Sequence, residues 1–331
     1  MVILLFILLF NFNLFAIMDG VNTGIRDINI YGIFEKSSDN LNSLNCNPAS
    51  IVNNLSDRYL AVNITEQFVK NKEFHFLPYS FVIGGNITQS QFYFGVGNIQ
   101  YIYYDSFEDS STEVNKINFT IALPDNISGI NFNAGISINY YKINRKIENN
   151  IIKGNGLSID WGILKNFNKF GIGFSWHNGS KVNWEVNTIL DNEINSSFIF
   201  HTYVRIYSFD FILGWIHIFD LHHRNNGEST KNLVLRKSEN RLNLGIIVPF
   251  MSNLKLKFGI YNINNFYNED IIEKNSIQFV SIFGINTRIQ KISINMTYQD
   301  SNLISSPKGY ESVNNFTRVI ISIGYSFGKG E

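Results

Sequence analysis

Alternating runs of apolar and small polar residues fill most of the chain after residue 57. In the run from 130 to 140, isoleucine, phenylalanine and tyrosine alternate with asparagine, glycine and serine. Because successive side chains of a β-strand point to opposite faces, each run predicts a strand with one apolar face and one small, polar face. The pattern recurs at 117–123, 207–215, 242–248, 254–260, 292–298 and 319–327, so we expect an all-β chain.

Charged residues interrupt this pattern instead of coating one face of it. They gather at 105–113, 144–153, 220–231 and 268–274 and make up 16% of the chain, against roughly a quarter of a soluble domain. A soluble sandwich would carry charges on its outer face. Here the runs reach the length at which a tilted strand crosses a bilayer, where a sheet must close to pair its backbone. The sequence predicts a transmembrane antiparallel β-barrel of about 14 strands, in a range of roughly fourteen to sixteen.

The two faces of these strands predict two environments. If the small row faces inward, the lumen is lined by Asn131, Asn133, Ser158, Asp160, Ser175, His177 and Asp210. Aromatic residues near strand ends are expected to form the belts at the membrane interfaces. The aromatic residues in such positions are Tyr140, Tyr141, Trp184, Trp215, Tyr261 and Tyr325.

The N-terminal part of the chain does not alternate. Residues 1–18 predict a secretory signal peptide, because their apolar run is shorter than the roughly 20 residues of a membrane-spanning helix; an uncleaved anchor is the alternative. Residues 19–56 are mixed, with short helical turns expected at 32–36 and after Pro48. This segment is either a plug inside the barrel or a periplasmic turn and helix. Residues 57–331 are predicted to form the barrel.

Several function classes are disfavoured by charge and motif content. Basic and acidic residues balance at 27 each, so no basic field would attract nucleic acid. The best candidates for a catalytic or metal site are Asp220, His222 and His223, with the isolated His177 and His201. The first three lie in a polar loop, and no hydrolase or metalloprotease motif accompanies them. We therefore expect no enzyme activity, metal or cofactor.

Short motifs occur at both ends and in the middle of the chain. An Asp-x-Gly strand precedes a Gly-x-Gly-x-Ser strand that ends in Asn-x-Gly, an Asn-Pro-Ala segment lies near the N-terminus, and the closing strand reads "RVIISIGYSF". Together these motifs resemble those of the PorV/PorQ and UPF0164 group of outer-membrane proteins, which belong to the FadL-like barrels. The matching motif residues are Asn47, Pro48, Ala49, Asp160, Gly162, Gly171, Gly173, Asn178 and Gly179.

This resemblance implies a barrel in the bacterial outer membrane, in contact with its lipid. It implies one of two roles. The first is transport or binding of an apolar small molecule. The second is service as a barrel component or substrate shuttle of a type IX-like protein secretion system, with secretion proteins as partners. We favour transport, because it requires only the fold, and an outer-membrane enzyme is the least favoured class.

Overall fold

A computed structural model describes residues 47–54, 59–69, 79–86, 93–105, 110–126, 131–147, 150–178, 183–184, 196–218, 239–269, 272–301, 303 and 316–326. Strands make up nearly all of this part of the chain. A short 3-10 helix, η2 (Pro48–Asn54), precedes the strands. The strands are β1 (Tyr59–Val69), β2 (Tyr79–Asn86), β3 (Tyr93–Asp105), β4 (Ser110–Leu123), β5 (Asn133–Ile147), β6 (Asn150–Asn166), β7 (Phe170–His177), β8 (Asn183–Trp184), β9 (Ser197–Ile206), β10 (Phe209–Ile218), β11 (Glu239–Met251), β12 (Leu254–Glu269), β13 (Ile272–Ile289), β14 (Ile292–Asp300) and β15 (Phe316–Ser326).

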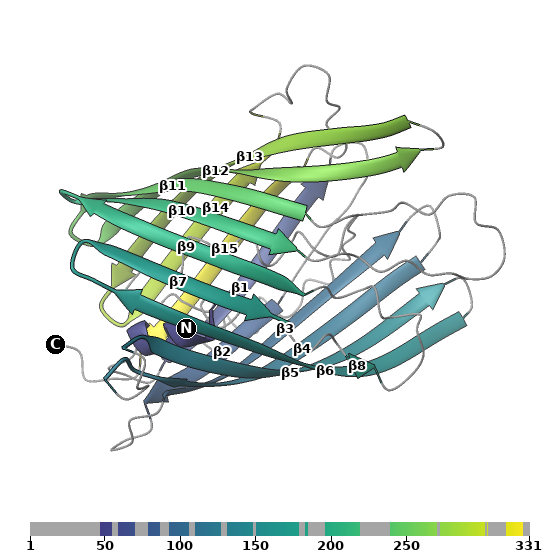
Figure 1. The fold of residues 1–331 in the computed structure, drawn as a ribbon, viewed down its shortest axis with the longest axis horizontal. Helices are drawn as coiled ribbons and strands as arrows, with labels where there is room; N and C mark the ends of the chain where they lie inside the picture. The colour runs from purple at the N-terminus through teal and green to yellow at the C-terminus, as the bar shows by residue number, and fades with distance from the viewer. Residues whose placement is uncertain are drawn as a thin grey trace.

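The strands pair antiparallel with their neighbours and close into a barrel (Figure 1). β1 pairs with β15, and β5 pairs with β6, so the circuit of pairing is complete. β8 is a two-residue strand that pairs with β6 beyond the end of β7. The remaining strands of the described chain, fourteen in number, form the closed circuit. The predicted fold and strand number are confirmed.

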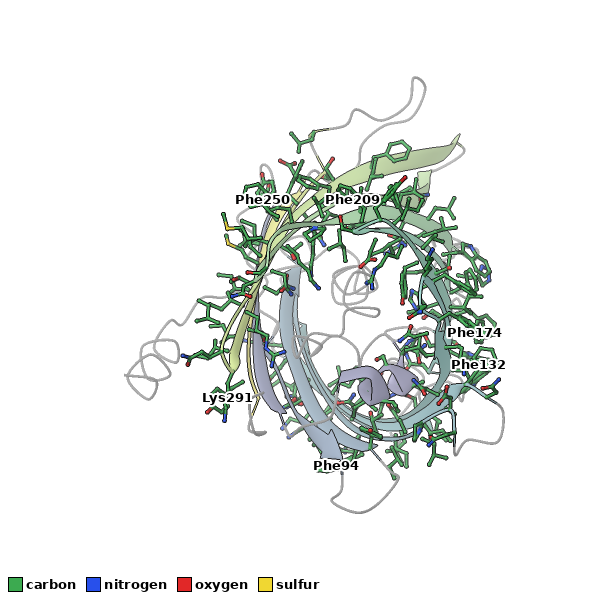
Figure 2. The ribbon with its side chains drawn as sticks, turned by 90° about the vertical axis from the view of Figure 1, so that its left-hand side faces the viewer. Phe94, Phe132, Phe174, Phe209, Phe250 and Lys291 are labelled. Atoms are coloured by element: carbon green, nitrogen blue, oxygen red, sulfur yellow. The ribbon has the colours of Figure 1, made fainter. Side chains whose placement is uncertain are left out.

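The two faces of the barrel differ as the alternation predicts. Phe119, Ile121, Ile136 and Ile138 point outward and are exposed, whereas the intervening residues point inward and are buried. The side chains lie on both sides of the ring of strands in a view along the barrel (Figure 2). Outward apolar side chains are also exposed on β6, β7, β9, β10, β11, β13, β14 and β15. This surface is the one that lipid requires of a spanning barrel.

The predicted aromatic belts are correct for some residues and wrong for others. Tyr140, Trp215 and Tyr325 point outward and are exposed. Tyr141 and Tyr261 are buried on the inner face, so their assignment to a belt is wrong. Tyr141 directly follows the outward Tyr140, so the two adjacent aromatic side chains lie on opposite faces of the sheet. The side chain of Trp184 lies outside the described residues.

One end of the barrel, which we call the short-turn end, has tight turns between four pairs of successive strands. Two-residue turns connect β9 to β10, β11 to β12 and β13 to β14 there, and residues 167–169 connect β6 to β7. The longest connection, residues 219–238, joins β10 to β11 at the other end. Bacterial barrels have their short turns on the periplasmic side. Within the described ranges, no helix has both the length and the apolar character needed to cross a bilayer.

The helix η2 lies inside the ring of strands (Figure 2). It contacts β3, β4, β5 and β6. Asn47, Ala49, Ser50 and Ile51 have no exposed surface. The helical turn expected after Pro48 is therefore present, and it lies against the inner wall. The predicted signal peptide and the turn at 32–36 lie outside the described residues, and the limits of the three segments remain a prediction.

Candidate functional site

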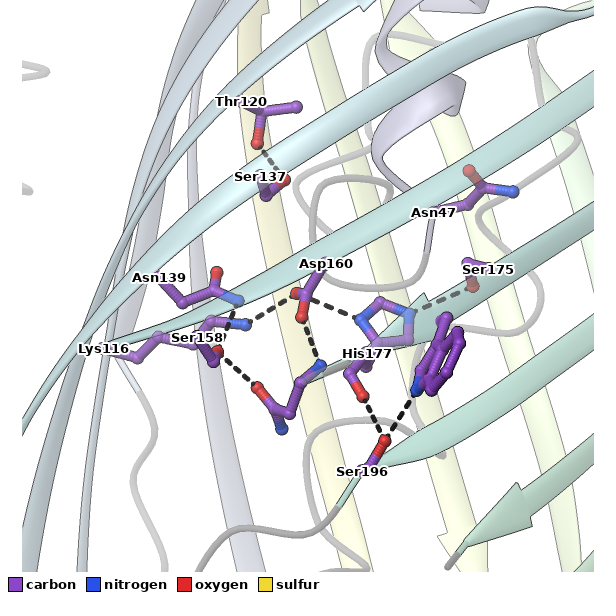
Figure 3. Close-up of polar contacts among 12 residues, drawn as sticks. Asn47, Lys116, Thr120, Ser137, Asn139, Ser158, Asp160, Ser175, His177 and Ser196 are labelled. Atoms are coloured by element: carbon purple, nitrogen blue, oxygen red, sulfur yellow. Dashed lines mark hydrogen bonds and ion pairs between the residues drawn. The ribbon is translucent and has the colours of Figure 1, made fainter. Parts of the chain in front are cut away.

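The inner wall formed by β4, β5, β6 and β7 carries a connected group of polar side chains centred on Asp160 (Figure 3). Asp160 is fully buried on β6. Its Oδ2 lies 3.4 Å from Lys116 Nζ and 3.1 Å from His177 Nδ1. Its Oδ1 accepts a hydrogen bond of 2.6 Å from the backbone N–H of Asn178. A buried carboxylate is stable only with such partners, and here each oxygen has at least one.

Asn178 extends this group where β7 ends. It has a positive φ of 51° and a fully buried side chain. Asparagine tolerates this conformation better than most residues. The Asn178 Oδ1 accepts hydrogen bonds of 2.8 Å from both Tyr141 Oη and Ser158 Oγ, and Asn139 Nδ2 donates to Ser158 Oγ at 3.1 Å. The end of β7 is thus held to β5 and β6 from the inside of the barrel.

The Asn-Pro-Ala segment is fastened to the same wall. Asn47 Nδ2 donates to the carbonyl oxygens of Ile163 and Phe174, at 3.0 and 3.2 Å. These two residues are register partners on β6 and β7, so one side chain bridges both strands. Asn47 Oδ1 accepts from the backbone N–H of Ala49 at 3.0 Å. A Cβ at Gly162 would collide with the Asn47 side chain.

The structure brings most of the predicted motif residues together. Asn47 lies against Gly162 and Gly173, and Asp160 binds Asn178. Gly171 is further along β7, where a Cβ would meet the ring of Tyr203. Gly179 lies outside the described residues. A role of these motif residues in the function of the resembled group stays a prediction. Their contacts explain why the fold requires these residue types on the inner wall.

Gly135 also holds the segment, although sequence reasoning did not select it. A Cβ at this β5 position would collide with the backbone of Pro48 and Ala49. We predict that Gly135→Val forces η2 away from the wall and lowers the free energy of unfolding by about 1–3 kcal/mol, the usual cost of overpacking. Urea unfolding in lipid vesicles would measure it. Ala134→Val is the matched control, because its side chain points to the outer face; an equal loss in both variants would contradict this account.

Asp160, His177 and Ser175 are connected in the order found in serine hydrolases. Ser175 Oγ lies 3.0 Å from His177 Nε2, whose Nδ1 faces Asp160. All three side chains are buried, and Ser175 has no exposed surface for a substrate to reach. Asp160 is also engaged by Lys116 and Asn178. The three side chains therefore hold the strands of the wall together, and the Ser175 hydroxyl is not accessible as a nucleophile.

The structure describes one of the other candidate catalytic residues. His201 is buried on the inner face of β9. Asp220, His222 and His223 lie outside the described residues. In the part of the chain that the structure describes, no group of three or more His, Cys, Asp or Glu residues is placed to hold a metal ion.

The inner face of β9 to β13 carries an apolar cluster that sequence reasoning missed. A cluster of buried, inward-facing side chains runs across β9, β10, β11, β12 and β13. The lumen was expected to be mildly polar, and here the apolar cluster stands among buried polar side chains such as Asn243 and Lys257. The signal was present in β10, "FDFILGWIHI", where the inward Ile212 and Ile216 stand between outward apolar residues. The cluster consists of Ile199, Tyr203, Ile212, Ile216, Ile247, Tyr261, Val280 and Ile282.

Solved structures that resemble this barrel include a monoaromatic hydrocarbon channel, a FadL homologue and a toluene transporter. The CymD monoaromatic hydrocarbon channel superimposes with a TM-score of 0.63 at 11% identity, covering 93% of this chain and 98% of that chain. A FadL homologue from Pseudomonas aeruginosa gives 0.61 at 10% identity, covering 95% and 100%. The toluene transporter TbuX from Ralstonia pickettii gives 0.59 at 10% identity, covering 87% and 94%.

The chain has the fold of these barrels. The likeness extends over nearly the whole length of each protein, so it includes the closed circuit of strands. No family model and no curated protein matches the sequence. The agreement is thus one of backbone architecture, and the side chains of this chain must supply the argument for function.

Proposed function

We propose that this protein is an outer-membrane β-barrel that binds an apolar small molecule in its lumen and passes it across the membrane. The observation that carries the proposal is the apolar cluster on the inner face of β9 to β13, which stands among a few buried polar side chains. The inside of a water-filled barrel is polar, whereas sites for small apolar ligands are lined mainly by hydrophobic side chains with a few polar groups. The inner faces of this barrel supply both kinds of lining.

The two kinds of inner lining suit this role. The polar wall of β4 to β7 is linked by hydrogen bonds around Asp160 and holds η2 in place. The apolar cluster lies on other strands, beside polar side chains such as Arg241 and Lys257. A solute that enters between the buried side chains of this cluster gains roughly 25 cal/mol per Å² of apolar surface buried. The similar backbone of a monoaromatic hydrocarbon channel and of a toluene transporter supports an apolar solute class.

Substitution of Ile212 tests this proposal. Ile212 is inward-facing and almost fully buried on β10. We expect Ile212→Asn to weaken toluene binding by the purified protein about tenfold, because an amide without a partner against an apolar ligand costs roughly 1–3 kcal/mol. Ile212→Val keeps the wall apolar and should bind within about twofold of the unaltered protein. Heat-modifiable gel mobility would show that both variants retain the barrel.

Equal toluene binding by the two variants would contradict the proposal. The alternative role as a secretion barrel of the PorV type predicts a different result from native affinity purification. A transporter should retain lipid or other apolar molecules, detected by mass spectrometry. A stoichiometric secretion protein recovered without bound lipid would reverse our ordering of the two roles.

A further inference from the structure

Asn243 is a buried polar residue beside the apolar cluster of the inner face. It lies on β11 with its side chain directed inward, and it is 2% exposed. Its amide Nδ2 donates no hydrogen bond to any residue that the structure describes. A buried amide donor without an acceptor destabilises a folded chain, so its presence calls for a physical explanation.

The residues in register with Asn243 do not supply the acceptor. They are Gly214 on β10 and Tyr261 on β12. Gly214 has no side chain. The Tyr261 hydroxyl donates to Gln299 Oε1 on β14 at 3.3 Å, so its ring extends over β13 and away from β11. The amide therefore has no polar partner on either neighbouring strand at its own level.

The next inward positions are apolar, lack a side chain or carry a donor. Ile212 and Ile216 occupy these positions on β10, and both are almost fully buried. On β11 they are Arg241 and Gly245. A guanidinium can only donate hydrogen bonds. Together these positions surround the Asn243 amide with apolar surface and with a second donor, and none of them carries a side-chain acceptor.

An apolar molecule with a carbonyl oxygen complements these surroundings. Its oxygen can accept a hydrogen bond from Asn243 Nδ2, while its hydrocarbon part lies against the isoleucine side chains. A carbonyl group brings an acceptor and no donor, so the pairing leaves no second polar group without a partner. A pure hydrocarbon would leave the amide as it is.

We propose that Asn243 is a specificity-determining residue of the lumen and that the solute is an apolar ketone, aldehyde or ester. Asn243 Nδ2 donates to the carbonyl oxygen when the solute lies against the apolar cluster. This inference rests on the proposed function, because it requires a solute in the lumen, and it narrows the class of that solute. A site built around one hydrogen bond discriminates against an analogue that lacks the acceptor.

Two probes of nearly the same shape test the proposal. Acetophenone has a C=O group where α-methylstyrene has a C=CH2 group. The full chain would be reconstituted in lipid nanodiscs and binding measured by headspace gas chromatography, with empty nanodiscs as the blank. We expect Asn243→Leu, which removes the amide at similar volume, to weaken acetophenone binding about tenfold. The binding of α-methylstyrene should change by no more than about twofold.

Asn118 provides the matched control. It is an inward asparagine on β4, 1% exposed, and its amide also makes no hydrogen bond to a described residue. Its register partner on β5 is Asn139, so it lies on the polar wall and away from the apolar cluster. Asn118→Leu should leave the binding of both probes unchanged, and heat-modifiable gel mobility would show that both variants form the barrel. An equal loss of acetophenone binding in the two variants would overturn the assignment to Asn243.

Infrared spectroscopy of the bound ketone gives a second measurement. With saturating acetophenone that carries a ¹³C-labelled carbonyl, the C=O band should lie at lower wavenumber in the unaltered protein than in Asn243→Leu, because a hydrogen bond weakens the C=O bond. A structural role of Asn243 would not move this band. Equal band positions, or an equal loss of both probes in Asn243→Leu, would overturn this inference alone. Binding of neither probe by the unaltered protein would overturn the proposed function as well.

Discussion

Replacing Ile136 by Arg is expected to lower the free energy of unfolding in a lipid bilayer by about 2–4 kcal/mol, the cost of a cation on the lipid face at the midplane. Ile136 points outward from β5 and is 57% exposed. It lies near the middle of an outward apolar row that runs from Ala134 to Tyr140 and is followed by Lys142. Urea unfolding in phosphatidylcholine vesicles, followed by tryptophan fluorescence, would measure the loss.

Ile151 on β6 provides the control for this experiment. It is also an isoleucine and is 61% exposed. It pairs with Lys146, and Lys153 is exposed two residues away, so it lies beyond the apolar band. Arg at this position should cost at most about 1 kcal/mol. If Ile136→Arg is tolerated as well as Ile151→Arg, the outer face of β5 does not contact lipid.

Removing the Asp160 carboxylate is expected to have a comparable or larger effect, about 3–5 kcal/mol for Asp160→Ala. The variant leaves the Lys116 amine, whose side chain is 12% exposed, without its carboxylate partner. It also removes the acceptor for the backbone N–H of Asn178, so the end of β7 loses a contact. The same vesicle unfolding assay applies.

Two further variants separate burial from charge pairing. Asp210→Ala breaks the ion pair with Arg205, whose side chain is 46% exposed, and should cost no more than about 1 kcal/mol. The double variant Asp160→Ala with Lys116→Met removes both buried charges, so it should lose less stability than Asp160→Ala alone. A double variant that is less stable than the single one would show that Lys116 does not depend on Asp160.

The barrel could be predicted from the sequence because lipid constrains the residue type at every position along a membrane-spanning strand. Ile136 and Ile138 had to face away from Ser137 and Asn139, and strand length followed from the thickness of the membrane. Belt positions were less predictable. Tyr140 and Tyr141 are adjacent and chemically identical, and the periodicity of the run decides which of them faces outward.

The inner wall depended on contacts between distant segments, which local patterns do not contain. The resemblance selected Asn47 and Gly162 together, but only the fold shows that Asn47 fills the space left by the missing Cβ. The apolar cluster escaped notice because Ile212 and Ile247 stand beside apolar neighbours, so alternation alone does not mark them as inward-facing. Which of two apolar rows faces the lumen follows from register across several strands.

The pairing of β1 with β15 bears on the biogenesis of the protein. Tyr59 lies opposite Ser326, so the seam joins residues separated by most of the polypeptide. Until β15 has been synthesised, β1 can pair only with β2, and its other edge presents a row of unpaired backbone groups, the kind of edge that recruits other chains. Contacts of such long range also form slowly. The polypeptide must therefore be kept from folding or aggregating in water until its last strand is available to complete the cylinder.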